Sequence, residues 1–291
     1  MNVTNILVTG ASGQLGCEIK SMSALYPQYE FTFSHREMLD LCDLSKTEEY
    51  FENKTFHVII NCAAYTAVDK AESEPELADT INHRFVNVLA RIVKKQHIKL
   101  IHISTDYVFN GQNYRPYIET DTTAPNSVYG RTKRDGENAI LAVGPANTII
   151  IRTSWVYSSF GNNFVKTMLR LGSEHDSLGV IFDQVGTPTY ARDLAHAILD
   201  ILPKINNDSP EIYHYSSEGS ASWYDFAKAI FELSDITCQV NPITTDQYPT
   251  PAMRPHYSLL NKSKIKNDFN IAIPYWRDSL RTCLKELGAH S

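Results

Sequence analysis

The chain has 291 residues, of which 43% are hydrophobic and 21% charged, with a formal net charge of −6. This globular composition excludes disordered, collagen-like and disulfide-scaffold chains, and the length predicts one large domain or two modest ones. The signs of the charges are mixed along the chain, which argues against nucleic acid or a membrane surface as a partner. Scattered cysteines without a C-x-x-C pair, no signal-peptide start and no spanning apolar run predict a cytoplasmic protein.

In the first half of the sequence, short apolar runs alternate with stretches of helical periodicity. The runs are 6–8, 31–33, 58–60, 100–103 and 148–151, and the helical stretches are 14–25, 45–54, 75–97 and 128–142. Such alternation is typical of βαβ units, whose parallel strands are buried on both faces. We therefore expect the α/β class and a doubly wound, Rossmann-type parallel sheet with a ligand crevice at the carboxyl ends of its strands.

The pattern loosens after residue 155. Helical stretches at 162–171, 191–202, 222–233 and 275–287 are separated by connections that contain proline. We predict a dinucleotide-binding domain over 1–155 and a smaller, mixed substrate-binding portion over 156–291. Some segments of the second part, such as 183–202, are expected to pack back on the sheet.

The first predicted strand leads directly into a glycine-rich loop. Glycine permits the tight turn and the close approach of a pyrophosphate, and the following helix offers free N–H groups to phosphates. The spacing is G-x-x-G-x-x-G rather than the commoner G-x-G-x-x-G, and a plain strand-to-helix turn is the alternative. The residues predicted to bind a dinucleotide here are Gly10, Ser12, Gly13, Gln14, Leu15 and Gly16.

The end of the second predicted strand bears on the choice of cofactor. An acidic residue usually holds the ribose 2′-hydroxyl of NAD at this place, but the sequence reads Ser34-His35-Arg36. Arg36 would accommodate a 2′-phosphate, which favours NADP(H) and leaves NAD(H) possible, unless its side chain is only solvated. Asp43 and Leu44 follow closely and are candidates for contact with the adenosine.

Three tyrosines are followed four residues later by a lysine: Tyr50 by Lys54, Tyr129 by Lys133 and Tyr224 by Lys228. Residues at this spacing share a helix face, where an ammonium would lower the tyrosine pKa and prepare it for proton transfer. The spacing is common by chance, so context must separate the pairs. Only the middle pair has a partner hydroxyl, because Thr105 ends a predicted strand at the carboxyl edge of the sheet. Thr105, Tyr129 and Lys133 are therefore the predicted catalytic group.

Seven segments over nearly the whole chain resemble the extended short-chain dehydrogenase/reductase superfamily, and within it the 4-ketoreductases of nucleotide sugars. These segments are 10–16, 61–72, 104–109, 129–133, 152–157, 183–189 and 254–258. The resemblance implies hydride transfer from NAD(P)H to the C4 keto group of dTDP-4-dehydro-L-rhamnose. Tyr129 would donate the proton, Lys133 would hold the nicotinamide ribose, and Thr105 would hydrogen-bond the reacting oxygen.

The resemblance also implies binding roles for residues outside this group. The residues expected to line the cofactor after the third strand are Ala63, Ala64, Tyr65 and Thr66. Asp106, Tyr107 and Trp155 would meet the sugar, with a turn cap and a packed interface as the alternatives for Asp106 and Trp155. Gln184 and Arg254 would contact the diphosphate or else only fasten loops.

Some relatives dimerise around a magnesium ion held by glutamates. Glu18 matches one such position, but Arg192 stands where a second acid is expected. We predict no bridging magnesium and no other metal, and a homodimer stays open.

Several other functions stay open at this point. A 4,6-dehydratase carries a glutamate where this chain has Tyr107, so simple reduction with an exchangeable cofactor is favoured over a dehydratase or epimerase that retains NAD. Reductases of other dTDP-linked 6-deoxy-4-keto sugars are harder to separate. A non-catalytic cofactor-binding subunit, similar to the regulatory subunit of methionine adenosyltransferase, is the alternative of a different class.

Overall fold

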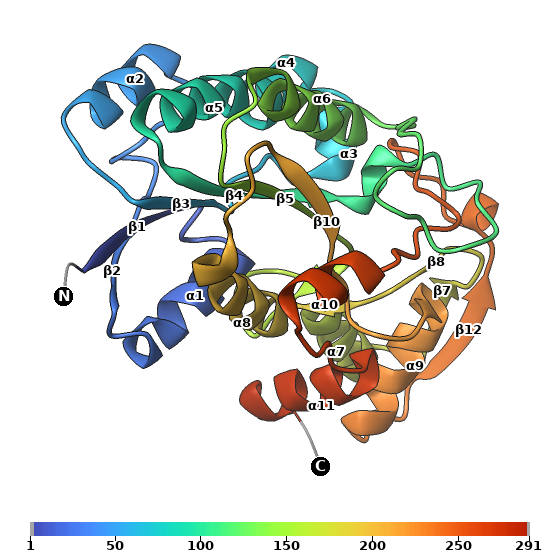
Figure 1. Cartoon of the computed structure of the whole chain (residues 1–291). Helices are drawn as coiled ribbons and strands as arrows, with labels where there is room; N and C mark the ends of the chain where they lie inside the picture. Colours follow the sequence, from blue (N-terminus) through green and yellow to red (C-terminus); the bar gives the residue numbers. More distant parts are fainter. Residues whose placement is uncertain (1–2, 290–291) are drawn as a thin grey trace.

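Six parallel strands form the central sheet, in the order β10-β5-β4-β3-β1-β2 (Figure 1). This computed structural model describes residues 3–289. The strands are β1 (Thr4–Thr9), β2 (Tyr29–Phe33), β3 (Val58–Asn61), β4 (Lys99–Thr105), β5 (Thr148–Thr153) and β10 (Glu211–His214). The prediction of an α/β, doubly wound parallel sheet is confirmed.

The apolar runs form strands because helices cover both faces of the sheet. Every residue of β3 and β5 is buried, as expected for central strands of a parallel sheet. Successive side chains of β1 point to opposite faces of the sheet. Leu7 packs with the helices on one face, whereas Ile6 and Val8 pack with those on the other.

Helices flank the sheet in two layers (Figure 1). One layer contains α2 (Leu44–Glu52), α3 (Val68–Ala71), α4 (Pro75–Asp79), α5 (Phe85–Gln96) and α6 (Val128–Val143). The other contains α1 (Gln14–Met22), α8 (Ala191–Ile201) and α10 (Ser263–Phe269). The helix predicted over 75–97 is interrupted by a π-helical turn, η2 (Thr80–Arg84).

The later part of the chain builds a second apolar core beside the sheet. Its helices are α7 (Phe164–Glu174), α9 (Trp223–Leu233) and α11 (Trp276–Glu286). Helix α9 packs against the parallel pair β7 (Ser177–Ile181) and β12 (Gln239–Ile243), and α7 and α11 pack against α9. Shorter pairs are β6 (Val156–Tyr157) with β9 (Thr189–Tyr190), and β8 (Val185–Gly186) with β11 (Ala221–Ser222). Single 3₁₀ turns are η1 (Ser23–Leu25), η3 (Asp106–Val108), η4 (Leu202–Lys204) and η5 (Thr245–Gln247).

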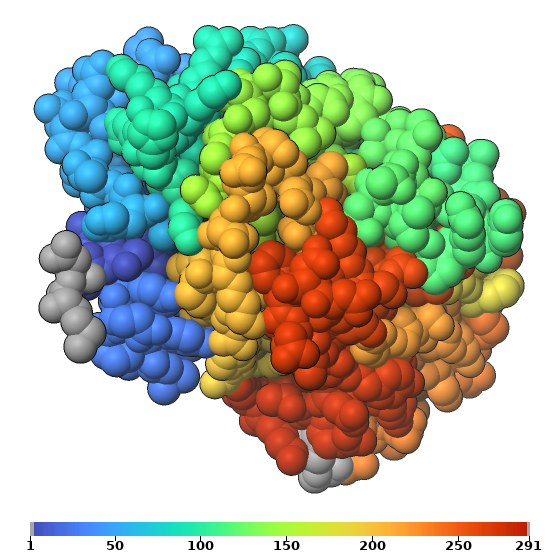
Figure 2. Space-filling view, viewed as in Figure 1, coloured from blue at the N-terminus to red at the C-terminus, as the bar shows by residue number. Residues whose placement is uncertain are grey.

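The two parts of the chain are interleaved rather than separate. Strand β10 and helices α8 and α10 come from beyond residue 155, yet they extend or cover the central sheet. Figure 2 shows the orange and red segments packed directly against green ones. The division at residue 155 stays a prediction. Within residues 3–289, no helix combines the length and the apolar character that a membrane span needs.

Candidate active site

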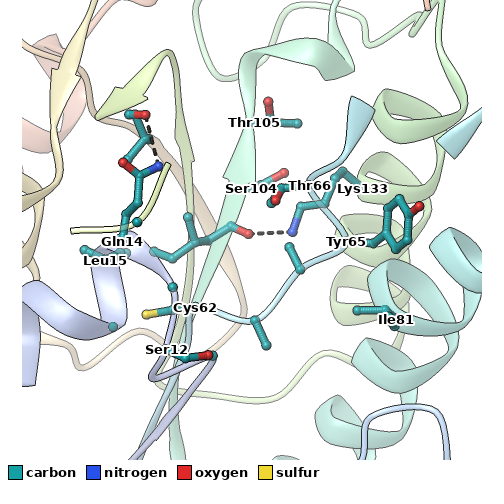
Figure 3. A pocket seen from close by; sticks show the side chains of 18 of the residues that line it. Ser12, Gln14, Leu15, Cys62, Tyr65, Thr66, Ile81, Ser104, Thr105 and Lys133 are labelled. Carbon is teal, nitrogen blue, oxygen red and sulfur yellow. Dashed lines mark hydrogen bonds between the residues drawn. The ribbon is translucent and has the colours of Figure 1, made fainter. Parts of the chain in front are cut away.

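A cavity of about 920 Å³ opens at the carboxyl ends of the central strands. It lies where the strand order reverses, because β1 is followed in the chain by β2 on one side and by β3 on the other. Parallel α/β sheets bind their ligands at such a switch point. The loops after β1, β2, β3, β4 and β5 all contribute to its wall. Figure 3 shows residues that follow β1 and β3, such as Ser12 and Cys62, together with Thr105 at the end of β4.

The predicted glycine loop lies on this wall, and its glycines are required by close packing. Gly10 has φ +66°, and a Cβ atom there would lie 2.7 Å from the backbone of Ala63. A Cβ atom at Gly16 would lie 2.4 Å from Gly10 O. Helix α1 begins after Gly13 without a side-chain cap, so its first N–H groups remain available to an anion. This cradle fits the pyrophosphate of a dinucleotide.

The loop after β2 forms the adjoining wall. Ser34, His35 and Arg36 line the cavity, and the Arg36 side chain is 81% exposed with only a 3.8 Å ion pair to Asp40. Its guanidinium is therefore free to meet a further phosphate. Ser34, His35 and Arg36 follow the second strand of the sheet, where a Rossmann fold contacts the adenosine ribose. A 2′-phosphate on this ribose would distinguish NADP from NAD.

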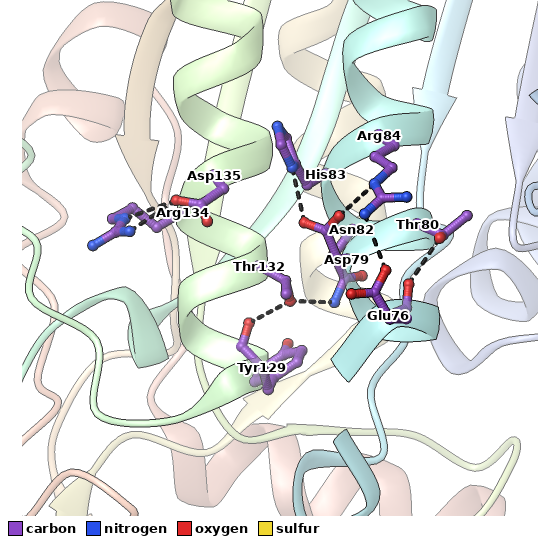
Figure 4. A network of polar contacts seen from close by, with 10 residues as sticks. All are labelled: Glu76, Asp79, Thr80, Asn82, His83, Arg84, Tyr129, Thr132, Arg134 and Asp135. Carbon is purple, nitrogen blue, oxygen red and sulfur yellow. Dashed lines mark hydrogen bonds and ion pairs between the residues drawn. The ribbon is translucent and has the colours of Figure 1, made fainter. Parts of the chain in front are cut away.

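The loop after β3 brings all four predicted residues, Ala63, Ala64, Tyr65 and Thr66, to the cavity. Asn82, which sequence reasoning missed, holds this loop from the π-helical turn η2. Its Oδ1 accepts from Tyr65 N at 2.9 Å, and its Nδ2 donates to Tyr65 O at 3.2 Å and to Thr132 Oγ1 at 3.1 Å. The Thr132 hydroxyl in turn donates to Tyr129 O at 3.0 Å (Figure 4). An asparagine inside a helical pattern gave no signal of this role.

Thr105, Tyr129 and Lys133 line one cavity with the glycine loop. Thr105 ends β4, and the other two lie on α6, whose N-cap residue Ser127 accepts from Gly130 N at 3.1 Å. Lys133 is 1% exposed, and its Nζ donates to Ile103 O at 2.7 Å.

Burial controls the protonation of these groups. It raises the pKa of the Tyr129 phenol to about 12, although a hydrogen bond with Thr105 acts in the opposite direction. It lowers the pKa of Lys133 to about 8, against the attraction of the Glu137 carboxylate. The pKa of the phenol therefore lies above its ordinary value because of burial, and the lowering effect of Lys133 stays a prediction. The phenol is protonated at neutral pH and suited to donate a proton.

Asp106 and Tyr107 follow Thr105 in the turn η3 and also line the cavity. Asp106 is 1% exposed, accepts from Thr105 Oγ1 at 3.0 Å, and has no partner for Oδ2 among the described residues. Burial raises its pKa to about 6. Tyr107 packs edge-on against Tyr129 with ring centroids 5.5 Å apart.

Trp155 lines the same cavity and is held in an unusual backbone conformation. Its φ is +47°, which is rare for a bulky residue and is typical of functional sites. Its indole stacks on Trp223 with centroids 3.6 Å apart. The stack presents a flat apolar surface beside the polar groups of the β4 loop.

The chain matches a known protein family over nearly its whole length. The family model described as "RmlD substrate binding domain" matches residues 4–289. The chain belongs to this family. A dTDP-4-dehydrorhamnose reductase of Sinorhizobium fredii is 42% identical over 284 residues, which are 95% of each chain.

Solved structures of the family share the whole fold. A dTDP-4-dehydrorhamnose reductase from Clostridium acetobutylicum has a TM-score of 0.92 and 40% identity over 98% of this chain and 100% of its own. The enzyme of the same name from Bacillus anthracis, solved in complex with NADP, also has a TM-score of 0.92, with 36% identity and the same coverage.

Four predicted ligand residues are not among those that line the cavity. Asp43 caps α2 by accepting from Lys46 N at 3.1 Å, and Leu44 is the first residue of that helix. Gln184 bonds to the Trp223 indole and to Thr245. Arg254 binds Asp69 in a bidentate pair at 3.0 and 2.7 Å. The contacts of Gln184 and Arg254 are those of the loop-fastening alternative, and contact of Asp43 and Leu44 with the adenosine stays a prediction.

The structure also shows the surroundings of Glu18 and Arg192, the two positions compared above with the magnesium-binding glutamates of some relatives. Glu18 is buried and accepts from Ser158 Oγ at 2.5 Å, whereas Arg192 pairs with Glu286. Residues 3–289 contain no cluster of three or more metal-ligating side chains, and the absence of magnesium stays a prediction. The pairs Tyr50/Lys54 and Tyr224/Lys228 lie away from the cavity wall.

Proposed function

We propose that this protein reduces the C4 keto group of dTDP-4-dehydro-L-rhamnose to give dTDP-L-rhamnose, with NADPH as the preferred hydride donor. The observation that carries the proposal is the meeting of Thr105, Tyr129 and Lys133 with the glycine loop in one cavity. Membership of a family whose relatives are named for this reaction supports it, as does the NADP complex of the Bacillus anthracis enzyme.

The chemistry that bound NADPH supplies is a hydride for C4. As C4 gains the hydride, the carbonyl π electrons move to oxygen, which takes the phenolic proton of Tyr129. The Thr105 hydroxyl, which donates to Asp106 Oδ1 in this structure, turns to donate its one hydrogen bond to the same oxygen. The ammonium of Lys133 stabilises the resulting phenolate, and its burial strengthens this interaction. One NADPH and one proton are consumed for each alcohol formed.

The walls of the cavity supply the groups that would hold NADPH. Helix α1 and Gly10, Gly13 and Gly16 form the cradle for the pyrophosphate, and Arg36 meets the 2′-phosphate. The sugar would lie between Trp155 and the β4 turn, where Asp106 offers an unpartnered carboxylate oxygen. Tyr107 fills the place where elimination of water would need a second carboxyl group, which favours reduction over dehydration.

The proposal is tested by following NADPH consumption with dTDP-4-dehydro-L-rhamnose and with other dTDP-linked 6-deoxy-4-keto sugars. Stoichiometric oxidation of NADPH separates a reductase from an enzyme that retains NAD. Tyr129→Phe should lower kcat by about 10²–10⁴-fold, the usual contribution of a general acid, and should keep NADPH binding. Tyr50→Phe, in another Tyr-x-x-x-Lys pair, is the matched control. Unchanged turnover of Tyr129→Phe would refute the proposed role of the phenol.

The cellular setting follows from the thiols and the substrate. All five cysteines are free, which fits a reducing compartment, and we assign the protein to the cytoplasm with a nucleotide sugar as its partner. Light scattering of the full chain distinguishes a monomer from a homodimer.

A further inference from the structure

A chain of buried polar groups lies behind Lys133, on the side away from the cavity. Thr9, Asn61 and His102 occupy one row across β1, β3 and β4, where the register pairs Thr9 with Asn61 and Asn61 with His102. All three are 0% exposed. None of them is needed for the reaction described above, and buried polar groups are costly unless they are hydrogen-bonded.

The hydrogen bonds in this row run in one direction. The Thr9 hydroxyl donates to Asn61 Oδ1 at 2.6 Å, and Asn61 Nδ2 lies 2.9 Å from His102 Nδ1. His102 Nε2 lies 3.5 Å from Lys133 Nζ. Among the described residues, the Thr9 hydroxyl donates its hydrogen to Asn61 Oδ1. Because the amide oxygen of Asn61 faces Thr9, its N–H₂ group faces the imidazole of His102.

This direction fixes the tautomer of His102. Burial lowers the pKa of His102 well below its ordinary value, so the ring is neutral. A neutral imidazole whose Nδ1 accepts a hydrogen bond carries its hydrogen on Nε2. The N–H of His102 therefore faces Lys133 Nζ, where it repels an ammonium group but donates to the lone pair of an amine.

We propose that His102 is a positioning residue for Lys133: held in its Nε2–H form by Thr9 and Asn61, it weakens the affinity of the lysine for a proton. The inference rests on the proposed function, because Lys133 belongs to the proposed reductase site. The 3.5 Å separation of Nε2 and Nζ, against 2.7 Å from Nζ to Ile103 O, is consistent with two facing donors.

Other charges around the lysine act with or against His102. Glu137 lies one turn further along α6 and favours the ammonium, but Arg152 binds its carboxylate in a bidentate pair at 2.9 and 2.7 Å. The remaining titratable groups that face this part of the site are Cys62, Tyr129 and Asp106. Glu137 still favours the ammonium, so the imidazole N–H, 3.5 Å from Nζ, acts in the direction opposite to the Glu137 carboxylate.

The consequence for turnover is a defined pH dependence. With its pKa near 8, Lys133 is an ammonium below that pH and an amine above it. Because the phenolate needs the positive charge, kcat for reduction should fall as the pH rises through this value. His102 would set where the fall occurs and would keep the lysine able to exchange a proton near neutral pH.

Thr9→Val is the sharpest test because valine has the shape of threonine but cannot orient Asn61. The amide and the imidazole are then free to reverse, so that Nε2 accepts from the ammonium. The pKa of Lys133 should rise by about one unit, a tenfold gain in proton affinity comparable to one hydrogen bond. His102→Gln, whose amide oxygen can turn toward Nζ, should shift it in the same direction. Thr148→Val, at a buried threonine of β5 that bonds to Ala146 O, is the control.

The pKa is read by NMR titration of the lysine Cε signals in the full chain, with the Lys133 signal assigned by its loss in Lys133→Met. The high-pH limb of kcat should move by the same amount as the pKa. An unchanged Lys133 pKa in both variants would overturn the inference. A lower Lys133 pKa would also overturn it, because it would mean that His102 in the wild type accepts a hydrogen bond from the ammonium. The titration needs no substrate, so a wild-type protein without reductase activity would defeat the proposed function alone.

Discussion

Gly130 lies next to Tyr129, where α6 crosses the carbonyl group of Tyr107. A Cβ atom at residue 130 would lie 2.2 Å from Tyr107 O. Real Cβ atoms essentially never approach closer than 3.0 Å, so Gly130→Ala must separate α6 from the turn η3 by about 0.8 Å, the difference between 3.0 and 2.2 Å. The turn begins directly after Thr105, so the shift changes the distance between the tyrosine and the threonine.

Catalytic groups must keep their geometry to within about 0.5 Å, and a displacement of 1 Å costs about a hundredfold in rate. We therefore expect Gly130→Ala to lower kcat by roughly 10–100-fold. The KM for NADPH should stay near that of the wild type, because the glycine loop does not move. The overpacked contact should also lower the free energy of unfolding by about 1–3 kcal/mol.

The assays are steady-state NADPH consumption and urea unfolding. Gly172→Ala is the matched control, because its Cβ atom would lie 2.6 Å from the Phe231 ring in the second core. It should lose similar stability and keep its kcat. A wild-type kcat for Gly130→Ala, or an equal loss of kcat in Gly172→Ala, would refute the reasoning from close packing.

Three other changes test the electrostatics. Arg36→Ala should raise the KM for NADPH about tenfold, which corresponds to the weakest hydrogen bonds that involve a charged group. The KM for NADH should not change, and equal effects on both cofactors would exclude a contact with the 2′-phosphate. Glu137→Gln should lower the free energy of unfolding in urea by about 3 kcal/mol or more, because Arg152 is left buried without its counter-charge; a loss under about 1 kcal/mol contradicts this. Burial lowers the pKa of His214 from 6.5 to about 3, so only the unfolded chain binds this proton as the pH falls below 6.5. His214→Gln should therefore lose less stability than the wild type between roughly pH 7 and pH 5, and an equal loss argues against a neutral buried ring.

The sequence was most informative where local periodicity and sheet topology act together. The i,i+4 spacing of Tyr129 and Lys133 and the position of Thr105 at a strand end were sufficient to predict that the three share one cavity. The parallel sheet was predictable for the same reason, since strands buried on both faces leave long apolar runs. The roles of the three residues stay predictions.

Contacts between distant loops were not predictable in this way. Arg254 is held by Asp69 and Gln184 by Trp223, and no periodicity tells which loop a long side chain will meet. Asp43 was a candidate ligand because it follows the second strand closely. An aspartate directly before a helix also tends to accept a hydrogen bond from the first turn of that helix, and Asp43 does so from Lys46 N. Strand β10 was missed because four residues at a sheet edge leave too short a pattern.

The late position of β10 in the sequence affects how the protein is made. Its partner β5 ends at Thr153, whereas β10 begins at Glu211, so the edge of β5 remains unpaired until the ribosome has released the intervening chain. At about 5–20 residues per second this interval lasts roughly 3–12 seconds. An open strand edge is a template for pairing with another chain, so nascent copies on one messenger RNA are most exposed to mutual association midway through translation.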